Sequence, residues 1–326
     1  MRAKPCFSLK AALGMSLVEL MVAALIGLIG SVVIFQVFAV FEGQKRTTTS
    51  GGDAQTNGAL ALFTVERDLR MAGYGINNLD FLGCTIRGWD EQTGGGTAFT
   101  LTLVPVVIKP SGAAAPTDPP ADPLADPDSD MIAVTYGTGE LLPNPASITQ
   151  NMPSPSSDFK VNNRYGFKEG DLVIAAEAGK DCTLAQVSTL PGTPGQTDNV
   201  IHNSGNYTDP NSGAQVATRY NKPAGLGVSY GTNGKLFNLG ALPSSNVYSV
   251  RSGQLMLQQR LSAASTAATP IYDGIVKMRA QYGKDTSVPA DGIVDVVDDV
   301  TPVNAAGWAQ VLVMRIAIVA RSSQYE

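Results

Sequence analysis

The chain has 326 residues, of which 44% are hydrophobic and 16% charged, so it holds enough apolar material for a sizeable core. Its formal net charge is -5, which gives no electrostatic basis for binding nucleic acid or anionic lipid. A single histidine, His202, and the lack of closely spaced cysteines argue against a zinc site and a histidine-based triad. We therefore expect no cofactor, no nucleic-acid partner and no enzymatic activity.

The N-terminal region is a short basic segment followed by a long apolar one. Residues 1–14 contain three basic side chains and no acidic one, and residues 15–41 contain one charged side chain, Glu19. As an α-helix, residues 15–41 would extend roughly 40 Å, which is enough to cross a hydrocarbon layer of about 30 Å. The basic segment would then stay cytoplasmic, and the rest of the chain would be exported.

Two ordinary alternatives fit this region less well. A secretory signal has an apolar region of about 7–15 residues that ends at a small-residue cleavage site. Here the apolar run is longer, and Ala23 and Ala24 lie inside it. A simple signal anchor accounts for the span but not for Glu19, and a carboxylate within a membrane helix costs about 2.5–3.5 kcal/mol.

The start of the apolar run resembles a known processing motif. Residues 14–20, Gly-Met-Ser-Leu-Val-Glu-Leu, are similar to the prepilin cleavage motif of type IV pilins and type II secretion pseudopilins. The resemblance implies that prepilin peptidase cuts between Gly14 and Met15 and methylates the new amine of Met15, where the family commonly has Phe. It also implies that Glu19, the fifth mature residue, pairs with the Met15 ammonium of a neighbouring subunit and sets the register of assembly.

A second helical segment comes after the apolar one. The glycine pair at 51–52 and the threonines before it weaken a helix, so we expect a kink or a loosened turn there, with Asp53 capping the second segment. Apolar residues at helical spacing then predict a face that packs on a globular domain: Leu62, Val65, Leu69 and Ala72. Charged residues, Asp68 among them, fill the other faces, and Gly73 ends the helix.

The end of this helix carries a second resemblance. Residues 66–75 and the pair Gly83-Cys84 resemble PilW-type minor pilins, in which an R-x-A-G-Y run precedes a Gly-Cys pair. Residues 271–282 with the apolar run at 310–320 also look PilW-like. A J-like pseudopilin of type II secretion is the close competitor. The resemblance implies a pilin-like α+β fold, in which a long N-terminal helix packs on an antiparallel β-sheet domain.

Short runs rich in β-branched and aromatic residues, separated by Gly, Pro, Asn and Asp, predict strands in the remaining chain. They are residues 98–108, 131–136, 171–176, 184–188, 246–251, 255–257, 274–282, 292–297 and 310–320. The last run is almost entirely apolar around Arg315, which is typical of a central strand. Polar stretches near 110–130 and 191–234 predict flexible surface loops.

These elements predict three parts. Residues 1–14 form a leader peptide, and residues 15–73 form the N-terminal helix, with a transmembrane segment at about 15–41. Residues 74–326 form a β-rich globular domain. If that domain is exported, we expect a disulfide between Cys84 and Cys182, because oxidising compartments favour such bonds; two buried free thiols are the alternative.

The acidic stretch at 285–299 is a candidate calcium site. Its carboxylates include Asp285, Asp291 and Asp295, and such oxygen ligands suit a hard cation. The spacing does not fit the EF-hand loop, and an Asp291-Gly292 turn between strands explains the same pattern without a metal. The sequence has no motif of serine hydrolases, P-loop proteins or zinc proteases.

The resemblance implies a minor pilin of a type IV pilus, acting in an initiation or tip complex. Its expected partners are prepilin peptidase, and the other minor pilins and the major pilin through the N-terminal helix. It would lie in the bacterial inner membrane, with its C-terminal domain in the periplasm, and in the pilus after assembly. The alternatives are a J-like type II secretion pseudopilin, and an adhesin or binding module that uses the loops at 110–130 and 191–234.

Overall fold

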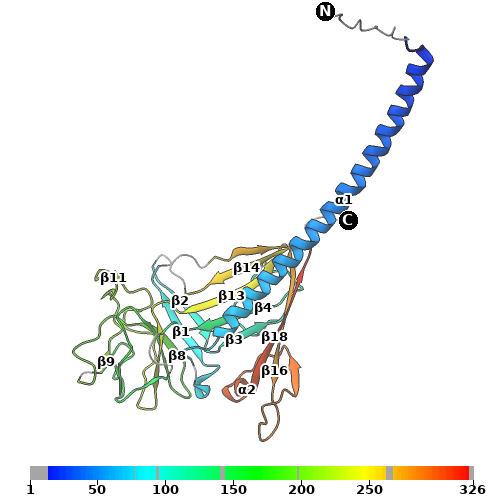
Figure 1. The fold of residues 1–326 in the computed structure, drawn as a ribbon. Coiled ribbons are helices and arrows are strands. Elements are labelled where there is room, and N and C mark those ends of the chain that lie inside the picture. The colour runs from blue at the N-terminus through cyan, green and yellow to red at the C-terminus, as the bar shows by residue number, and fades with distance from the viewer. Residues whose placement is uncertain are drawn as a thin grey trace, which may run out of the picture. The chain divides into compact units, whose positions relative to one another are not determined.

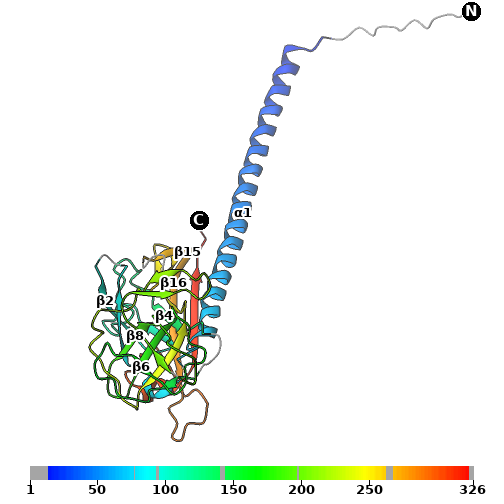
Figure 2. The ribbon, with the colours of Figure 1, turned by 90° about the vertical axis from the view of Figure 1, so that its left-hand side faces the viewer.

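The computed structural model describes residues 14–76, 78–92, 95–139, 144–196, 198–261 and 267–322. The chain divides into two compact units, residues 1–53 with 322–326, and residues 54–321. One long helix and a set of mostly antiparallel strands make up the described residues (Figures 1 and 2). This α+β combination confirms the predicted fold class, although the strands form several sheets and not one.

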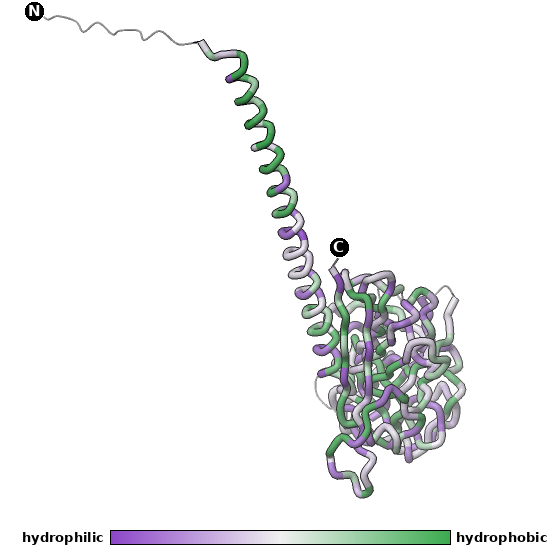
Figure 3. The backbone as a smooth tube through the Cα atoms, turned by 90° about the vertical axis from the view of Figure 1, so that its right-hand side faces the viewer, coloured by the Kyte–Doolittle hydropathy of each residue, from purple (hydrophilic) through white to green (hydrophobic). Residues whose placement is uncertain are grey.

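Helix α1 spans Leu17–Met71 without a break. Residues 14–49 are all exposed, and Figure 3 shows the apolar character of the first half of the helix. The expected loosening near residues 51–52 is wrong. Thr47 Oγ1 and Thr48 Oγ1 donate hydrogen bonds to the carbonyl oxygens four residues earlier, over 3.2 and 2.9 Å, and such bonds make threonine compatible with a helix.

Two glycines with positive φ end helix α1 at its C-terminus. Gly73 and Gly75 have φ values of +80° and +82°, in the left-handed region where a Cβ atom is unfavourable. The Gly73 N–H donates to the carbonyl oxygen of Thr135 over 2.9 Å, so the end of the helix is also bonded to a strand. A short 3-10 turn, η1 (Leu79–Phe81), comes next.

A six-stranded sheet has the order β2-β1-β8-β7-β12-β5. Its strands are β1 (Thr85–Asp90), β2 (Thr97–Thr102), β5 (Ala146–Ser147), β7 (Leu172–Ala176), β8 (Cys182–Gln186) and β12 (Lys235–Gly240). All its pairings are antiparallel except that of β1 with β8, which is parallel. Two small sheets pair β6 (Phe159–Lys160) with β9 (Asn199–Val200), and β10 (Asn206–Thr208) with β11 (Gln215–Ala217).

A five-stranded sheet has the order β15-β14-β13-β4-β3, and a three-stranded sheet the order β17-β16-β18. The strands of the first are β3 (Val106–Lys109), β4 (Met131–Tyr136), β13 (Ser244–Arg251), β14 (Gln254–Gln259) and β15 (Thr269–Asp273). Those of the second are β16 (Ile275–Lys284), β17 (Val296–Asp298) and β18 (Val311–Ala320), with the short helix α2 (Ala305–Ala309) before β18.

Strand β18 lies at the edge of its sheet, so the prediction of a central strand is wrong. Its burial alternates: Met314, Ile316 and Ile318 pack against the core, whereas Val313 and Val319 are 50% and 51% exposed. The near-continuous apolar run that suggested burial on both faces therefore has one face in the core and one in solvent.

The α1 residues of the second unit contribute to the largest core cluster. Ala61 and Val65 are fully buried in it, with strands β3, β4, β13 and β16, and Leu69 and Ala72 pack at its margin. Leu62, which the spacing had assigned to this face, is 40% exposed. The buried face thus runs through Ala61 and not through Leu62.

Candidate assembly helix and its anchor

The expected processing and assembly residues stand at the N-terminal end of α1. Ser16 is the residue before the helix, and its Oγ accepts a hydrogen bond from the Glu19 N–H over 3.3 Å. This is the first half of a capping box, Ser-x-x-Glu, in which the serine satisfies an otherwise unpaired amide. Met15 is exposed by 65%. Residues 1–13 of the expected leader, Cys6 included, lie outside the described residues.

Glu19 also occupies a position that suits a carboxylate electrostatically. It lies in the first turn of α1, where the helix dipole stabilises negative charge by about 0.3–1 kcal/mol. The geometry therefore gives Glu19 a local role as well as the assembly role that the motif implies. A substitution that keeps one role and removes the other can separate them.

Asp68 anchors α1 within the second unit. Its side chain is buried, and its Oδ2 accepts hydrogen bonds from Tyr248 Oη and Asn246 Nδ2, each over 2.6 Å. Its Oδ1 accepts a third, from Tyr136 Oη, over 3.2 Å. A buried carboxylate is tolerated when it is bonded in this way, because the donors replace its hydration. The helical spacing had assigned Asp68 to a face other than the buried one, and that prediction is wrong.

The two tyrosines beside Asp68 remain hydrogen-bond donors at neutral pH. Burial raises the pKa of Tyr248, and the Asp68 carboxylate raises it further. Burial also raises the pKa of Tyr136. A second contact lies one turn earlier, where Thr64 Oγ1 is 2.8 Å from Tyr272 Oη. The C-terminal part of α1 is thus held to β4, β13 and β15 by polar as well as apolar contacts.

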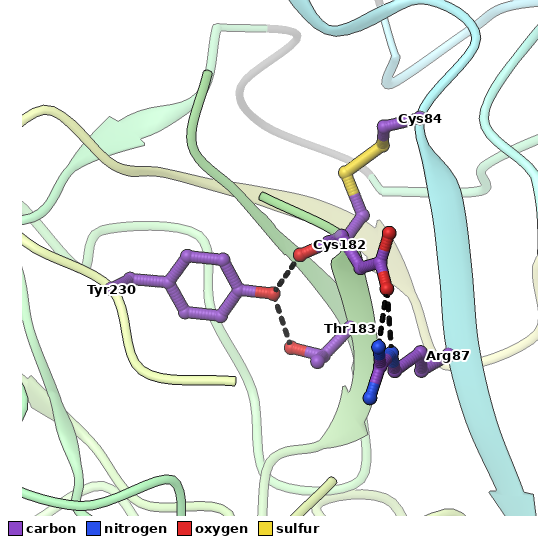
Figure 4. The surroundings of a disulfide bond; sticks show 6 residues. Cys84, Arg87, Cys182, Thr183 and Tyr230 are labelled. Atoms are coloured by element: carbon purple, nitrogen blue, oxygen red, sulfur yellow. Dashed lines mark hydrogen bonds and ion pairs between the residues drawn. A yellow bond between two sulfur atoms is a disulfide. The ribbon is translucent and has the colours of Figure 1, made fainter. Parts of the chain in front are cut away.

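The predicted disulfide is present between Cys84 and Cys182, whose Cα atoms are 6.0 Å apart. It links the residue before β1 to the first residue of β8, beside the parallel pairing of these strands. Figure 4 shows its surroundings, with Arg87, Thr183 and Tyr230 close by. Arg87 pairs with Asp181, the residue before Cys182, and Tyr230 Oη donates to the Asp181 carbonyl oxygen over 2.8 Å. Cys182 is fully buried.

The stretch at 110–130 contains no helix or strand, but its carboxylates are not simply solvated. Three of them pair with arginines on or beside strands: Asp118 with Arg260, Asp122 with Arg251, and Asp130 with Arg279. Lys109 Nζ also donates to the carbonyl oxygens of Pro116 and Pro119, over 2.8 and 3.2 Å. The composition predicted only a surface loop here, because a sequence does not show the arginines that fold against these residues.

The carboxylates of the three calcium candidates accept hydrogen bonds from backbone N–H groups within the same stretch, 285–299. Asp285 Oδ2 accepts from the Gly292 N–H over 2.7 Å, Asp291 Oδ1 from the Ile293 N–H over 2.9 Å, and Asp295 Oδ2 from the Thr286 N–H over 2.8 Å. Within the described part of the chain, no group of three or more His, Cys, Asp or Glu side chains is placed to hold a metal ion. These bonds fit the turn that was the alternative interpretation.

Among the described residues, α1 is the one helix long and apolar enough to cross a membrane, with a mean hydropathy of 2.5 in its apolar window. Such a helix can serve as a membrane anchor. Together with the β-rich domain, it forms an α+β arrangement with one long apolar N-terminal helix, as the predicted fold class requires.

A comparison with protein families supports a more particular resemblance. The family model for PilW, Type IV Pilus-assembly protein W, matches residues 244–326, which run from β13 through β18. The match confirms the PilW-type resemblance and implies involvement in type IV pilus assembly, together with other assembly components. It includes the PilW-like runs at 271–282 and 310–320, whereas residues 66–84 lie outside it. No curated protein and no solved structure matches the chain.

Proposed function

We propose that this chain is a minor pilin that prepilin peptidase cleaves between Gly14 and Met15 and methylates on Met15. The family match at 244–326 carries the proposal, because it concerns pilus assembly and lies far from the N-terminal motif. The motif at 14–20 and the apolar helix after it support the proposal independently. The leader then covers 1–14, the assembly helix 15–73 and the globular domain 74–326.

Glu19 acts at the subunit interface in this proposal. Cleavage creates an ammonium group on Met15, four residues before the Glu19 carboxylate. Packed helices of adjacent subunits can bring the ammonium of one to the carboxylate of the other, and each charge then offsets the desolvation of its partner. Such a pair favours one axial offset between helices, so Glu19 sets register while the apolar side chains provide contact area.

Asp68 attaches the C-terminal segment of α1 to the globular domain. The segment of α1 in the second unit is fixed on β13 and β4 through Asp68 and packs in the core through Ala61 and Val65. The C-terminal segment of α1 is therefore attached to the β-rich domain by both polar and apolar contacts. In this proposal, that domain is the part of the subunit that meets other minor pilins.

Deletion and complementation test the proposal. A strain that lacks this chain should lose most surface pili while keeping type II secretion, and the wild-type gene should restore piliation. Loss of secretion with normal pili would instead favour a J-like pseudopilin. Normal pili and secretion with lost adherence would favour an adhesin.

A further inference from the structure

Strand β18 has a free edge. It pairs antiparallel with β16 over Val311–Ala320, and no other described strand pairs with it. An unpaired edge presents a row of N–H and C=O groups that another extended chain can bond. Proteins commonly protect such edges with proline or several charges, whereas Arg315 is the single charged residue of β18 and the strand has no proline.

The outer face next to this edge is positively charged. Lys277 lies opposite Val319, and Arg315 lies opposite Gln281, so both cations are on the solvent side of the β16–β18 pair. No described acidic side chain forms an ion pair with either of them, whereas the neighbouring Arg279 is paired with Asp130 over 2.8 Å. The chain as a whole has a net charge of -5, so this local positive charge is not a general property of its surface.

The inner side of the same strand borders an apolar cavity of about 330 Å³. Its lining consists of apolar and aromatic residues from α1, η1, β3, β16, α2 and β18, among them Leu69, Leu82, Tyr282, Trp308, Leu312 and Met314. Leu79 and Leu312 are 57% and 43% exposed, which marks the side on which the cavity opens. Its volume lies at the lower end of the range of about 300–1,000 Å³ that is typical of ligand pockets, so it can take a large apolar side chain.

We propose that the free edge of β18 receives an extended segment of a partner protein in which acidic and large apolar side chains alternate. Successive side chains of a strand point to opposite faces. A segment added to β18 therefore places one set of side chains toward the cavity. The next set lies on the outer face, beside Arg315 and one strand away from Lys277 on β16. Main-chain hydrogen bonds supply affinity, and the two sets of side chains supply specificity, as in other cases of strand addition.

A second copy of this chain is a poorer occupant. Antiparallel pairing of two β18 edges about the middle of the strand would bring Arg315 of one copy near Arg315 of the other. Like charges at neighbouring positions of a sheet are destabilising. The charge that disfavours self-pairing is the same one that favours an acidic partner. This inference rests on β16, β18 and the cavity, and it does not depend on N-terminal processing.

A pair of matched peptides tests whether β18 receives an acidic, apolar segment. One fluorescein-labelled peptide alternates aspartate and leucine three times between glycines, and the other has lysine in place of aspartate. Each is titrated against the full-length chain in nanodiscs of zwitterionic lipid, with fluorescence anisotropy as the readout. We expect the acidic peptide to bind at least tenfold more tightly and to slow amide hydrogen exchange in β18.

Substitutions beside β18 and at the cavity test where the acidic peptide binds. Exchanging both cations, Lys277→Glu with Arg315→Glu, should reverse the preference between the peptides, and Leu312→Asp at the cavity rim should weaken the acidic peptide about tenfold. Lys160→Glu on β6 is the matched charge control. It should change neither the preference between the peptides nor the affinity for the acidic peptide. Absence of binding, equal binding of both peptides, or a preference unaffected by the double variant would overturn the proposal.

Discussion

The Asp68 carboxylate on α1 lies 2.6 Å from the Tyr248 hydroxyl on β13, and this contact joins the helix to the centre of the five-stranded sheet. Asn246, two residues earlier on β13, donates to the same carboxylate oxygen. The Asp68 carboxylate thus accepts hydrogen bonds from two polar side chains of β13. Without it, these buried donors would lack this acceptor. Asp68 therefore adds a polar attachment to the apolar packing of Ala61 and Val65.

Replacing Asp68 with alanine should destabilise the domain by about 3 kcal/mol, because it leaves several buried donors unpaired. Tyr248→Phe should cost about 1–2 kcal/mol, since the carboxylate keeps its other donors. Thermal unfolding of the purified chain measures both changes. Glu66→Ala, on the exposed face of the same helix turn, is the control and should stay within about 0.5 kcal/mol of wild type. Equal stability of Asp68→Ala and wild type would contradict the anchoring role.

Glu19 is expected to matter for assembly and not for helix formation. Glu19→Ala should insert and be cleaved normally, yet its recovery in sheared pili should fall at least tenfold, because the Met15 ammonium of the neighbour loses its partner. Immunoblots of the pilus and membrane fractions measure this ratio.

Ser16→Ala separates the two roles of the motif. It removes the hydrogen bond to the Glu19 N–H but keeps the carboxylate, so its incorporation should resemble that of wild type. If Ser16→Ala fails as badly as Glu19→Ala, or if Glu19→Ala is incorporated normally, the register role is wrong.

The disulfide should be a major source of stability. It joins cysteines 98 residues apart in the sequence, and closing a loop of this size restricts the unfolded chain by an amount equivalent to about 4–5 kcal/mol. Reduction, or the double change Cys84→Ser with Cys182→Ser, should lower the midpoint of thermal unfolding markedly. Reductant should have no further effect on the double variant. An unchanged midpoint after verified reduction would show that the bond is dispensable.

His202 should make the stability of the domain fall in mild acid. Burial lowers its pKa below the usual 6.5, and its Nε2 donates to the Ser157 carbonyl oxygen over 3.0 Å while the ring lies against Phe159. The folded state therefore binds the proton less well than the unfolded state does. The contribution of neutral His202 to the free energy of unfolding is fully present above about pH 6.5. This contribution is lost as the pH falls from there toward the lower pKa of His202 in the folded state.

Unfolding midpoints between pH 7.5 and 5.5 test this dependence. The midpoint of wild type should fall over this range, and His202→Gln should flatten the curve because glutamine does not titrate. A curve for His202→Gln that runs parallel to that of wild type would assign the acid sensitivity to other groups.

The sequence predicted the features that depend on local pattern. The apolar run after Met15 predicted the first half of α1, and the glycines at 73 and 75 predicted its end. The strands at 131–136 and 172–176, rich in Val and Ile, were found almost to the residue. Among the strands that were missed, β1 and β12 contain glycine and polar residues, and β15 contains proline. The short strands β9, β10 and β11 were also missed, because they lie in the polar stretch at 191–234 that was predicted to be a loop.

The sequence could not predict features that depend on tertiary partners. An apolar run such as β18 resembles a central strand because periodicity does not show which strands lie on either side. Asp68 resembles a solvated residue because its donors, Tyr248 and Asn246, are some 180 residues away in the sequence. One signal was available: Asp68 comes three residues after Val65 and four before Ala72, which places it on the buried face.

The N-terminus of the mature chain tests the central claim most directly. The full-length protein is co-expressed with a prepilin peptidase, purified, and measured by intact-mass and N-terminal peptide mass spectrometry. The account predicts a chain that begins at Met15 and carries one additional methyl group on its amine. An uncut chain, or a cut beyond Ala24, would contradict it.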